Sequence, residues 1–357
     1  MFYKKNIDQL VRKQTSQNRD LINGIVLDRN EKVSYFADNI FSSIKKKLSK
    51  YDLNTIPETS YLYKALCKYH KVKRNNIYIT QGITECMNQI MFSCVNKNEE
   101  VIIMEPSYPM YEVLCKLNNI KYKKWKFKDD FKLYVNDLKK LINKKTKILF
   151  LVNPNLPVEF EFNKKTKEEI YKICKKKNIL LVYDEAYHYF GAKSELKNAP
   201  NSKNLIVMRT FSKAWGLSGI RLGYMISNKK TTNYLSKCRS LVETNAMSQQ
   251  IGLWALKNKH ILNNHIKEVK QGEKFLRSNL KKLGYLTHGG KITNAILIKL
   301  KNEQSTINLK NYLKKKKIYI RVGFSKPISD FVRISLCTPK KLSIFLRYFK
   351  SWHKSLK

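Results

Sequence analysis

Short apolar runs recur along the first two thirds of the chain and are separated by longer segments with helical spacing. Continuous runs of four or five apolar residues are typical of strands that are buried on both faces. We predict strands at the runs IYIT (77–80), VIIM (101–104), ILFLV (148–152), ILLVY (179–183), LIVM (205–208) and GYMI (223–226). Between them lie amphipathic segments such as TKEEIYKICKKKN (166–178), so the pattern predicts an α/β fold with a mostly parallel sheet sandwiched by helices.

The pattern changes after about residue 240. A long helical stretch is predicted from residue 233 towards 283. Shorter strand-like runs follow at 294–300, 318–322 and 331–335. We therefore predict a large domain over 41–240 and a smaller α+β domain formed by 1–40 and 241–357.

Composition adds the expected compartment. Hydrophobic residues make up 43% of the 357 positions, which is enough for a packed core. No run approaches the roughly 20 apolar residues of a membrane span, and the N-terminus lacks the apolar block of a secretory signal. The seven cysteines form no CxxC pair, so reduced thiols and a cytoplasmic location are expected.

The formal charge of +44 raises the alternative of a nucleic-acid-binding protein. The segment KYKKWKFK (121–128) even interleaves basic and aromatic residues. However, the excess consists of 60 Lys and only 11 Arg, spread along the whole chain. Nucleic-acid readers depend on the forked contacts of Arg, so we interpret the charge as a composition bias and expect no specific nucleic-acid partner.

Candidate chemistry gathers after four of the predicted strands. Ligands of such sheets bind beyond the carboxyl ends of the strands. The residues at these positions are Gly82, Ile83 and Thr84, then Tyr108, then Asp184 and Tyr187, and finally Thr210, Ser212, Lys213 and Arg221. Gly82 stands where a helix begins, and backbone N–H groups at a helix start bind anions.

Together these groups match the needs of pyridoxal phosphate. A lysine bonds covalently to the aldehyde of the cofactor, and a carboxylate keeps its pyridine nitrogen protonated. Hydroxyls, amides and an arginine bind the phosphate. Lys213 has apolar neighbours, which lower the pKa of an amine towards a reactive free base. We predict no metal site.

Several motifs then resemble one family. They are ITQGITE (79–85), EPSYPMYE (105–112), LVNPNLP (151–157), VYDEAYHYF (182–190), TFSKAWGLSGIRLGY (210–224) and FVRISLCTP (331–339). In this order they are similar to the pyridoxal-phosphate-dependent aminotransferases of fold type I, the aspartate aminotransferase superfamily. The histidinol-phosphate aminotransferase branch is the most similar. The resemblance implies an aminotransferase that works as a homodimer with shared sites.

The resemblance also implies a role for each residue. Lys213 would be the covalent lysine, Asp184 would pair with the pyridine nitrogen, and Tyr187 would bond the phenolic oxygen. Tyr108 would stack on the ring. The phosphate would be held by Gly82, Ile83, Thr84, Thr210, Ser212 and Arg221. The substrate would be bound by Arg333, Arg321 and Asn30.

The chain departs from the family pattern in three places. The family motif Asn-Pro-x-Asn-Pro-Thr-Gly reads NPNLPVE (153–159) here, so Leu156 replaces the asparagine that bonds the phenolic oxygen. Tyr187 then carries that bond alone, or Asn155 assists it. The tyrosine that crosses the dimer interface is replaced by Ile56, with Tyr51 or Tyr61 as substitutes. The family's Asn-Glu-Asn-Pro reads NEKV (30–33).

Two alternatives remain open at this point. If Arg333 and Arg321 bind a substrate phosphate, a carboxylate would stand perpendicular to the cofactor ring and leave as carbon dioxide. That arrangement predicts a decarboxylase of a phospho-amino acid such as phosphoserine or phosphothreonine. The second alternative, prompted by Leu156, Lys32 and Ile56, is a degenerate relative that binds the cofactor without turnover.

Overall fold

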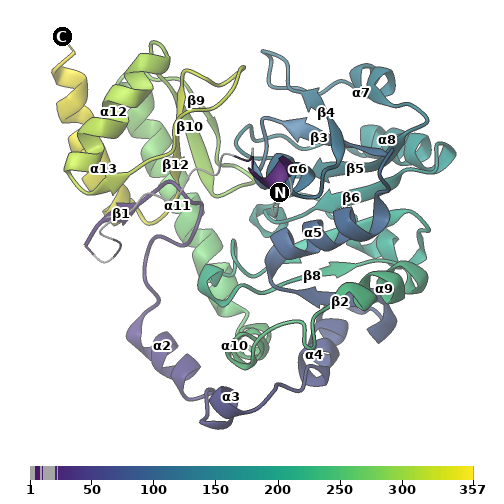
Figure 1. Ribbon diagram of the computed structural model, residues 1–357. Coiled ribbons are helices and arrows are strands. Elements are labelled where there is room, and N and C mark those ends of the chain that lie inside the picture. The colour runs from purple at the N-terminus through teal and green to yellow at the C-terminus, as the bar shows by residue number, and fades with distance from the viewer. Residues whose placement is uncertain (1–4, 9, 11–20, 22, 357) are drawn as a thin grey trace.

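The fold is built on a seven-stranded sheet (Figure 1). The computed structural model describes residues 5–8, 10, 21 and 23–356. In the sheet order, the strands are β2 (Ile77–Thr80), β8 (Gly223–Ile226), β7 (Leu205–Thr210), β6 (Leu180–Asp184), β5 (Thr146–Val152), β3 (Glu100–Glu105) and β4 (Lys121–Lys126). The pairs from β7 to β4 are parallel, and β8 runs antiparallel to both of its neighbours. The predicted mostly parallel sheet is confirmed, and all six apolar runs are strands of it.

Helices flank this sheet, as the α/β prediction required. They are α4 (Ser60–His70), α5 (Gly82–Cys94), α6 (Met110–Leu117), α7 (Val135–Leu141), α8 (Lys164–Lys176) and α9 (Lys229–Leu235). Helix α5 contacts β7 and β8, and α8 contacts β6. Every residue of β2, β7 and β8 is buried, which explains why these strands are apolar on both faces.

Strand β4 contains most of the basic and aromatic segment that suggested nucleic-acid binding. It is the edge strand of the sheet, where lysines discourage pairing with another chain. Its Trp125 is fully buried and stacks on Phe162. Lys123 pairs with Glu100 at 2.8 Å, and Lys124 pairs with Glu105 at 2.6 Å. The pattern is therefore explained by the place of the strand in the sheet.

The C-terminal part contains two small sheets (Figure 1). Strand β10 (Ala295–Lys299) lies between β9 (Thr287–Gly289) and β12 (Phe331–Ser335), antiparallel to both. Strand β1 (Ile25–Val26) pairs in parallel with β11 (Ile318–Tyr319), which brings the N-terminal segment onto this part. The helices here are α11 (His260–Lys282), α12 (Glu303–Lys315) and α13 (Pro339–Lys354). The division of the chain at residues 40 and 240 stays a prediction.

The prediction of one long helical stretch from residue 233 to 283 is wrong. Helix α9 ends at Leu235, and α10 (Ala246–Lys257) and α11 are separate helices. The interruption has a local cause, because the side chain of Asn245 accepts a hydrogen bond from the backbone N–H of Ser248 at 2.8 Å. Such a cap begins a helix and competes with its continuation.

Short elements complete the chain. They are α1 (Lys5–Asp8), α2 (Asp38–Lys45), α3 (Tyr51–Asn54) and the 3-10 turns Arg74–Asn76, His188–Phe190, Leu196–Asn201, Ser218–Ile220 and Ser236–Cys238. None of the described helices combines the length and the apolarity needed to cross a bilayer. Within the same residues, no group of three or more His, Cys, Asp or Glu side chains is arranged to hold a metal ion.

Candidate active site

The candidate residues meet at one edge of the seven-stranded sheet. Strands β5, β6 and β7 are adjacent and parallel, so their carboxyl ends lie side by side. Asp184 is the last residue of β6, and the loop with Lys213 follows Thr210, the last residue of β7. The edge thus brings together an acid and an amine, as the strand ends predicted.

The amine of Lys213 lies in an enclosed position, and no carboxylate of the described residues pairs with it. Its Nζ donates to the backbone carbonyls of Arg29 and Asn30, each at 3.3 Å. It also lies 5.7 Å from the centre of the Tyr187 ring. Burial lowers the pKa of Lys213 to about 8, and the positive charge of Arg333 acts in the same direction. About a tenth of this amine is therefore unprotonated at pH 7, far more than for a lysine with its ordinary pKa.

Asp184 is buried and fixed by two hydrogen bonds. The hydroxyl of Tyr111 donates to Oδ2 at 2.7 Å, and the backbone N–H of Ala186 donates to Oδ1 at 2.9 Å. Burial raises the pKa of this carboxyl, while Tyr111 and Ala186 oppose the rise. The carboxylate is therefore held in one orientation at the end of its strand.

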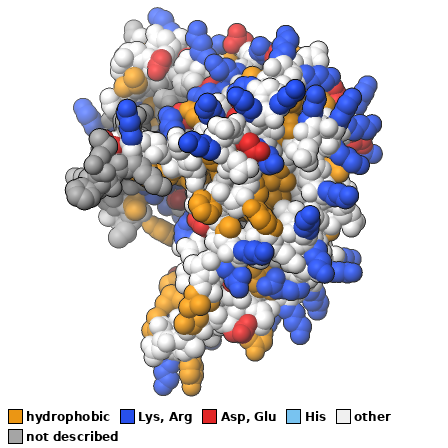
Figure 2. Space-filling model, turned by 45° about the vertical axis from the view of Figure 1, so that its right-hand side comes forward, with side chains coloured by type: hydrophobic (Ala, Val, Ile, Leu, Met, Phe, Trp, Pro, Cys, Tyr) orange, Lys and Arg blue, Asp and Glu red, His pale blue; other side chains and the backbone are white. Residues whose placement is uncertain are grey.

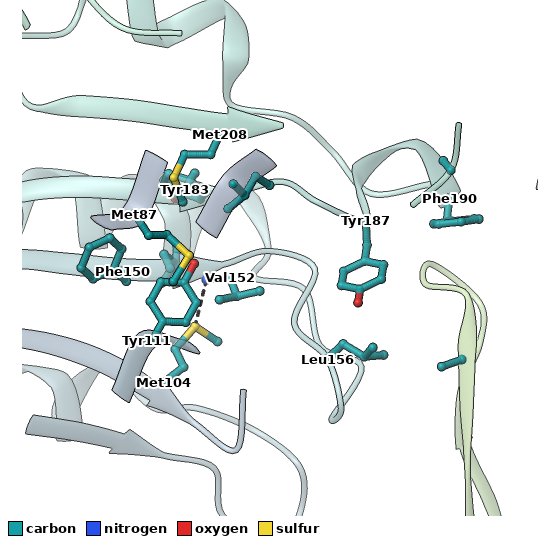
Figure 3. Packing of buried hydrophobic residues seen from close by; sticks show 14 of the residues in the cluster. Met87, Met104, Tyr111, Phe150, Val152, Leu156, Tyr183, Tyr187, Phe190 and Met208 are labelled. Carbon is teal, nitrogen blue, oxygen red and sulfur yellow. Dashed lines mark hydrogen bonds between the residues drawn. The ribbon is translucent and has the colours of Figure 1, made fainter. Parts of the chain in front are cut away.

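Sequence reasoning missed Tyr111 and an ion pair beside Asp184. Tyr111 packs among Met87, Met104 and Phe150 (Figure 3), and its ring centre lies 5.1 Å from that of Phe150. The Nε of Arg209 donates to Oε2 of Glu185 at 3.0 Å, and Nη2 donates to the same oxygen at 2.8 Å. Glu185 and Arg209 adjoin Asp184 and Thr210, so they fix the ends of β6 and β7 together. Glu185 lies within the motif VYDEAYHYF and Arg209 directly before TFSKAWGLSGIRLGY, and these positions were the signal available in the sequence.

The hydroxyl of Tyr187 faces an asparagine and a leucine. The Asn30 amide donates to it at 3.1 Å. Figure 3 shows Leu156 on a facing loop, with its side chain pointing towards Tyr187. Asn155 is fully buried, and its amide group donates to the carbonyls of Pro106 and Val158. Both of its described donor contacts are thus to the backbone, and the side-chain oxygen is the atom left without a partner among the described residues.

An anion-binding cradle lies at the start of α5. Gly82 has φ of 78°, and the residue before the helix, Gln81, provides no side-chain cap. A Cβ built on Gly82 would lie 2.9 Å from Nη2 of Arg221, and one on Gly223 would lie 2.7 Å from the carbonyl carbon of Gly82. The backbone thus approaches closely and leaves the first N–H groups of the helix, including that of Ile83, available to an anion.

Hydroxyl groups surround this helix start. Nη1 of Arg221 donates to Oγ of Ser212 at 3.3 Å, and Oγ1 of Thr210 donates to the same oxygen at 3.0 Å. The hydroxyls of Thr84 and Tyr108 lie 3.2 Å apart. Across the described ranges, Arg221 forms no ion pair with a carboxylate. An uncapped helix start, hydroxyls and an unpaired guanidinium fit a phosphate group.

Two further arginines, Arg333 and Arg321, lie side by side on the C-terminal part. Arg333 of β12 and Arg321 form an antiparallel bridge, with their backbone N–H groups donating to each other's carbonyls at 2.8 and 3.2 Å. Nη2 of Arg333 donates to the Asp28 carbonyl at 2.6 Å, while its buried Nε has no partner in the described part of the chain. Burial lowers the pKa of Arg333 to about 10, and the charge of Arg321 contributes. Asn30 is bound to the same strand as Arg333, because its backbone N–H donates to the hydroxyl of Ser335 in β12 at 2.9 Å.

Comparison with known proteins places this geometry in context. Residues 34–349 match the family described as aminotransferase class I and II. The chain is 31% identical over 315 residues to a histidinol-phosphate aminotransferase of Clostridium novyi, covering 87% of each chain. It is 28% identical over 353 residues to that of Methanocaldococcus jannaschii, covering 96% of this chain and 92% of the relative. The crystal structure of histidinol-phosphate aminotransferase from Sinorhizobium meliloti in complex with pyridoxal-5'-phosphate has the same fold, with a TM-score of 0.89 at 19% identity and coverage of 100% and 98%.

Proposed function

The chain belongs to the class I and II aminotransferases and is a pyridoxal-phosphate-dependent enzyme, and we propose that its amino donor is a small phosphorylated amine or amino acid. The observation that carries this substrate class is the pair Arg333 and Arg321. Neither guanidinium has a carboxylate partner within the described residues, and Arg333 keeps a buried Nε unpaired. Two unpaired guanidinium groups favour a dianion such as a phosphate.

Pyridoxal phosphate supplies an aldehyde and an electron-accepting ring when it is bound. In the proposed site, the Lys213 amine would attach to that aldehyde, whose oxygen leaves as water, and would act as the base for the proton on the substrate carbon that bears the amino group. Asp184 would hold the pyridine nitrogen, and Tyr111 and Ala186 keep its carboxylate oriented. Tyr108 would hold the ring, and Tyr187 would hold its phenolic oxygen. The cradle of Gly82, Ile83, Thr84, Thr210, Ser212 and Arg221 would hold the phosphate of the cofactor.

The decarboxylase alternative is not favoured. The relatives that cover most of this chain at about 30% identity carry the name of an aminotransferase. The name histidinol phosphate in those relatives supports a phosphorylated donor for this chain. Asn30 is proposed to contact this donor. It is hydrogen-bonded to both Lys213 and Tyr187 and lies beside β12, the strand that carries Arg333.

The test is a product and spectral assay of the purified, cofactor-loaded protein. Histidinol phosphate, phosphoserine and unphosphorylated analogues are offered with 2-oxoglutarate as the acceptor. We expect glutamate to form much faster with a phosphorylated donor than with its unphosphorylated analogue, and with ping-pong kinetics. Equal rates with unphosphorylated donors would contradict the substrate proposal, and release of carbon dioxide without glutamate would contradict amino transfer by this enzyme.

We also propose that the enzyme is a homodimer. Large apolar side chains are exposed over residues 35–61, and this region projects from the molecule (Figures 1 and 2). Their exposed fractions are 71% for Tyr35, 55% for Phe41, 73% for Tyr51, 69% for Leu53, 64% for Ile56 and 66% for Tyr61. An exposed apolar patch of this kind marks an interaction surface, and the family supplies the second copy as the partner.

Charged residues on this patch should prevent dimer formation. We expect the double variant Phe41→Lys/Leu53→Lys to elute as a monomer, because four ammonium groups, two from each copy, would have to be desolvated in the interface. Light scattering after size-exclusion chromatography measures the mass directly. Leu286→Lys, at a side chain that is 70% exposed in the C-terminal part, is the matched control and should stay dimeric. A wild-type protein of monomer mass would refute the proposal.

The effect of having Leu156 in place of the family's asparagine should be visible in the spectrum of the bound cofactor. Leucine cannot donate a hydrogen bond to the phenolic oxygen, so we expect Leu156→Asn to lower the pH at which the visible band of the cofactor-loaded protein changes by about one unit. The measurement is a pH titration of that band. Leu156→Met keeps the site apolar and should leave the midpoint in place. An equal shift in both variants would show that packing, and not the lost donor, sets the midpoint.

A further inference from the structure

Glu159 contacts a turn that is far away in the sequence. It follows β5 by seven positions, and its carboxylate accepts four hydrogen bonds from the turn after β9. Oε2 accepts from the backbone N–H of Gly290 at 2.9 Å and of Ile292 at 3.1 Å, and from Oγ1 of Thr293 at 2.7 Å. Oε1 accepts from the N–H of Lys291 at 3.1 Å. We call residues 290–293 with the Glu159 carboxylate the Glu159 clasp.

The backbone of the turn is shaped to receive an anion. Gly289 and Gly290 have φ of 82° and 85°, a conformation that points successive N–H groups in one direction and that other residues rarely adopt. A Cβ built on Gly289 would lie 3.1 Å from Cβ of Glu159. From the other side, Nη1 of Arg277 in α11 donates to Oγ1 of Thr287 at 2.8 Å. The turn is therefore fixed between α11 and Glu159, and the internal carboxylate fills its anion-binding concavity.

The turn leads directly into the candidate active site. Asn294, the next residue, is fully buried, and its amide donates to the carbonyl of Asn30 at 2.9 Å. That same carbonyl accepts from Nζ of Lys213, and the side chain of Asn30 donates to the hydroxyl of Tyr187. Glu159 is thus connected to two residues of the proposed mechanism in three steps. It is hydrogen-bonded to Thr293, the peptide bond leads from Thr293 to Asn294, and hydrogen bonds lead from Asn294 through Asn30 to Lys213 and Tyr187.

The clasp also joins two segments that face each other across the site. Glu159 lies in the same loop as Leu156, which points towards Tyr187 (Figure 3). The turn continues into β10, which pairs with β12 and places Leu297 opposite Arg333. The family pattern has a glycine at the position of Glu159, so this carboxylate is a feature of this chain.

We propose that Glu159 is a positioning residue, which holds Asn30 and the arginine-bearing sheet in the binding arrangement before the substrate arrives. It touches neither the cofactor nor the substrate. A site that is arranged in advance binds its ligand more tightly, because no binding free energy is used to select the competent arrangement. Once the substrate is bound, the arrangement is the same with or without the clasp. Loss of Glu159 therefore raises KM and leaves kcat nearly unchanged.

The first test is hydrogen exchange of the cofactor-loaded, full-length protein. In Glu159→Gln, the amide that replaces one carboxylate oxygen faces N–H donors and cannot accept from them. We expect exchange of the backbone amides to become about tenfold faster at 290–292 and also at 28–30, a segment that Glu159 does not contact. Glu161→Gln, two residues further along the same loop, is the matched control and should change neither segment. Faster exchange confined to 290–293 would overturn the proposal, because Glu159 would then act only locally.

The second test is kinetic and rests on the proposed substrate class. We expect KM for the phosphorylated donor to rise about tenfold in Glu159→Gln while kcat stays within about twofold. Thr293→Val removes one donor and keeps the backbone of the turn, so it should shift KM in the same direction by less, even if the glutamine variant does not fold. A fall in kcat at unchanged KM would overturn the proposal. If the wild-type protein accepts no phosphorylated donor, the substrate proposal fails, while exchange at 28–30 still decides the role of Glu159.

Discussion

Replacement of Lys213 by alanine is expected to lower kcat/KM by at least about a thousandfold, since it removes both the covalent attachment of the cofactor and the proposed base. The amine is held between the Arg29 and Asn30 carbonyls in an enclosed position. Borohydride reduction of the cofactor-loaded wild-type protein, followed by peptide mass analysis, should locate the cofactor at position 213. Lys237→Ala, at an exposed lysine, is the control and should keep both the label and the activity.

The burial of Lys213 also determines how the rate of cofactor capture depends on pH. Because the pKa of Lys213 is lowered to about 8, the amine carries a proton below that pH and is free above it. The rate at which the cofactor-free protein captures pyridoxal phosphate should therefore rise through pH 8 and level off above it. A midpoint near the usual lysine value, above pH 10, would show that the amine is solvated. A label on another lysine would contradict the proposed mechanism as a whole.

Six strands of the large sheet could be predicted because they are buried on both faces. Leu205 to Met208 of β7 form a continuous apolar run, which is typical of a strand buried on both faces. Strand β4 was missed as a strand because it lies at the edge, where Lys121 and Lys126 are solvated and only Trp125 is fully buried. The break between α9 and α10 was missed because it depends on one asparagine cap within a sequence of good helix formers.

The residues of the candidate site also fall into those that the sequence predicts and those that it does not. Asp184 and Lys213 could be predicted because they follow strands, and parallel strands end at one edge. Tyr111 could not, because its bond to Asp184 depends on how α6 packs against β6, and 73 positions separate the two residues. The Glu159 clasp spans more than 130 positions and leaves no periodic signal in either segment. Asn155 belongs to the motif NPNLPVE, but its amide donates to the carbonyls of Pro106 and Val158. Its role towards the cofactor therefore stays a prediction.

The second large effect is expected at Arg333. Its guanidinium is buried, donates to the Asp28 carbonyl and keeps Nε without a partner among the described residues. Removing one side of a buried, hydrogen-bonded charge pair costs about 2–5 kcal/mol, so Arg333→Gln should raise KM for the phosphorylated donor by about thirtyfold or more. Arg333→Lys keeps the charge but loses the forked geometry, and it should recover only part of the affinity. Steady-state kinetics with varied donor measure both.

Variants of two further arginines, Arg321 and Arg347, test whether the expected rise of KM is specific to Arg333. Arg321 lies opposite Arg333 but is exposed, so Arg321→Gln should raise KM by a smaller factor. Arg347→Gln, at an exposed arginine of α13, is the matched control and should leave KM unchanged. If the substrate phosphate is bound by the pair, KM for an unphosphorylated analogue should be almost the same in the wild type and in Arg333→Gln. An equal rise of KM for both donors would instead place the carboxylate or another common group of the substrate at Arg333, and the phosphate would have to be bound elsewhere.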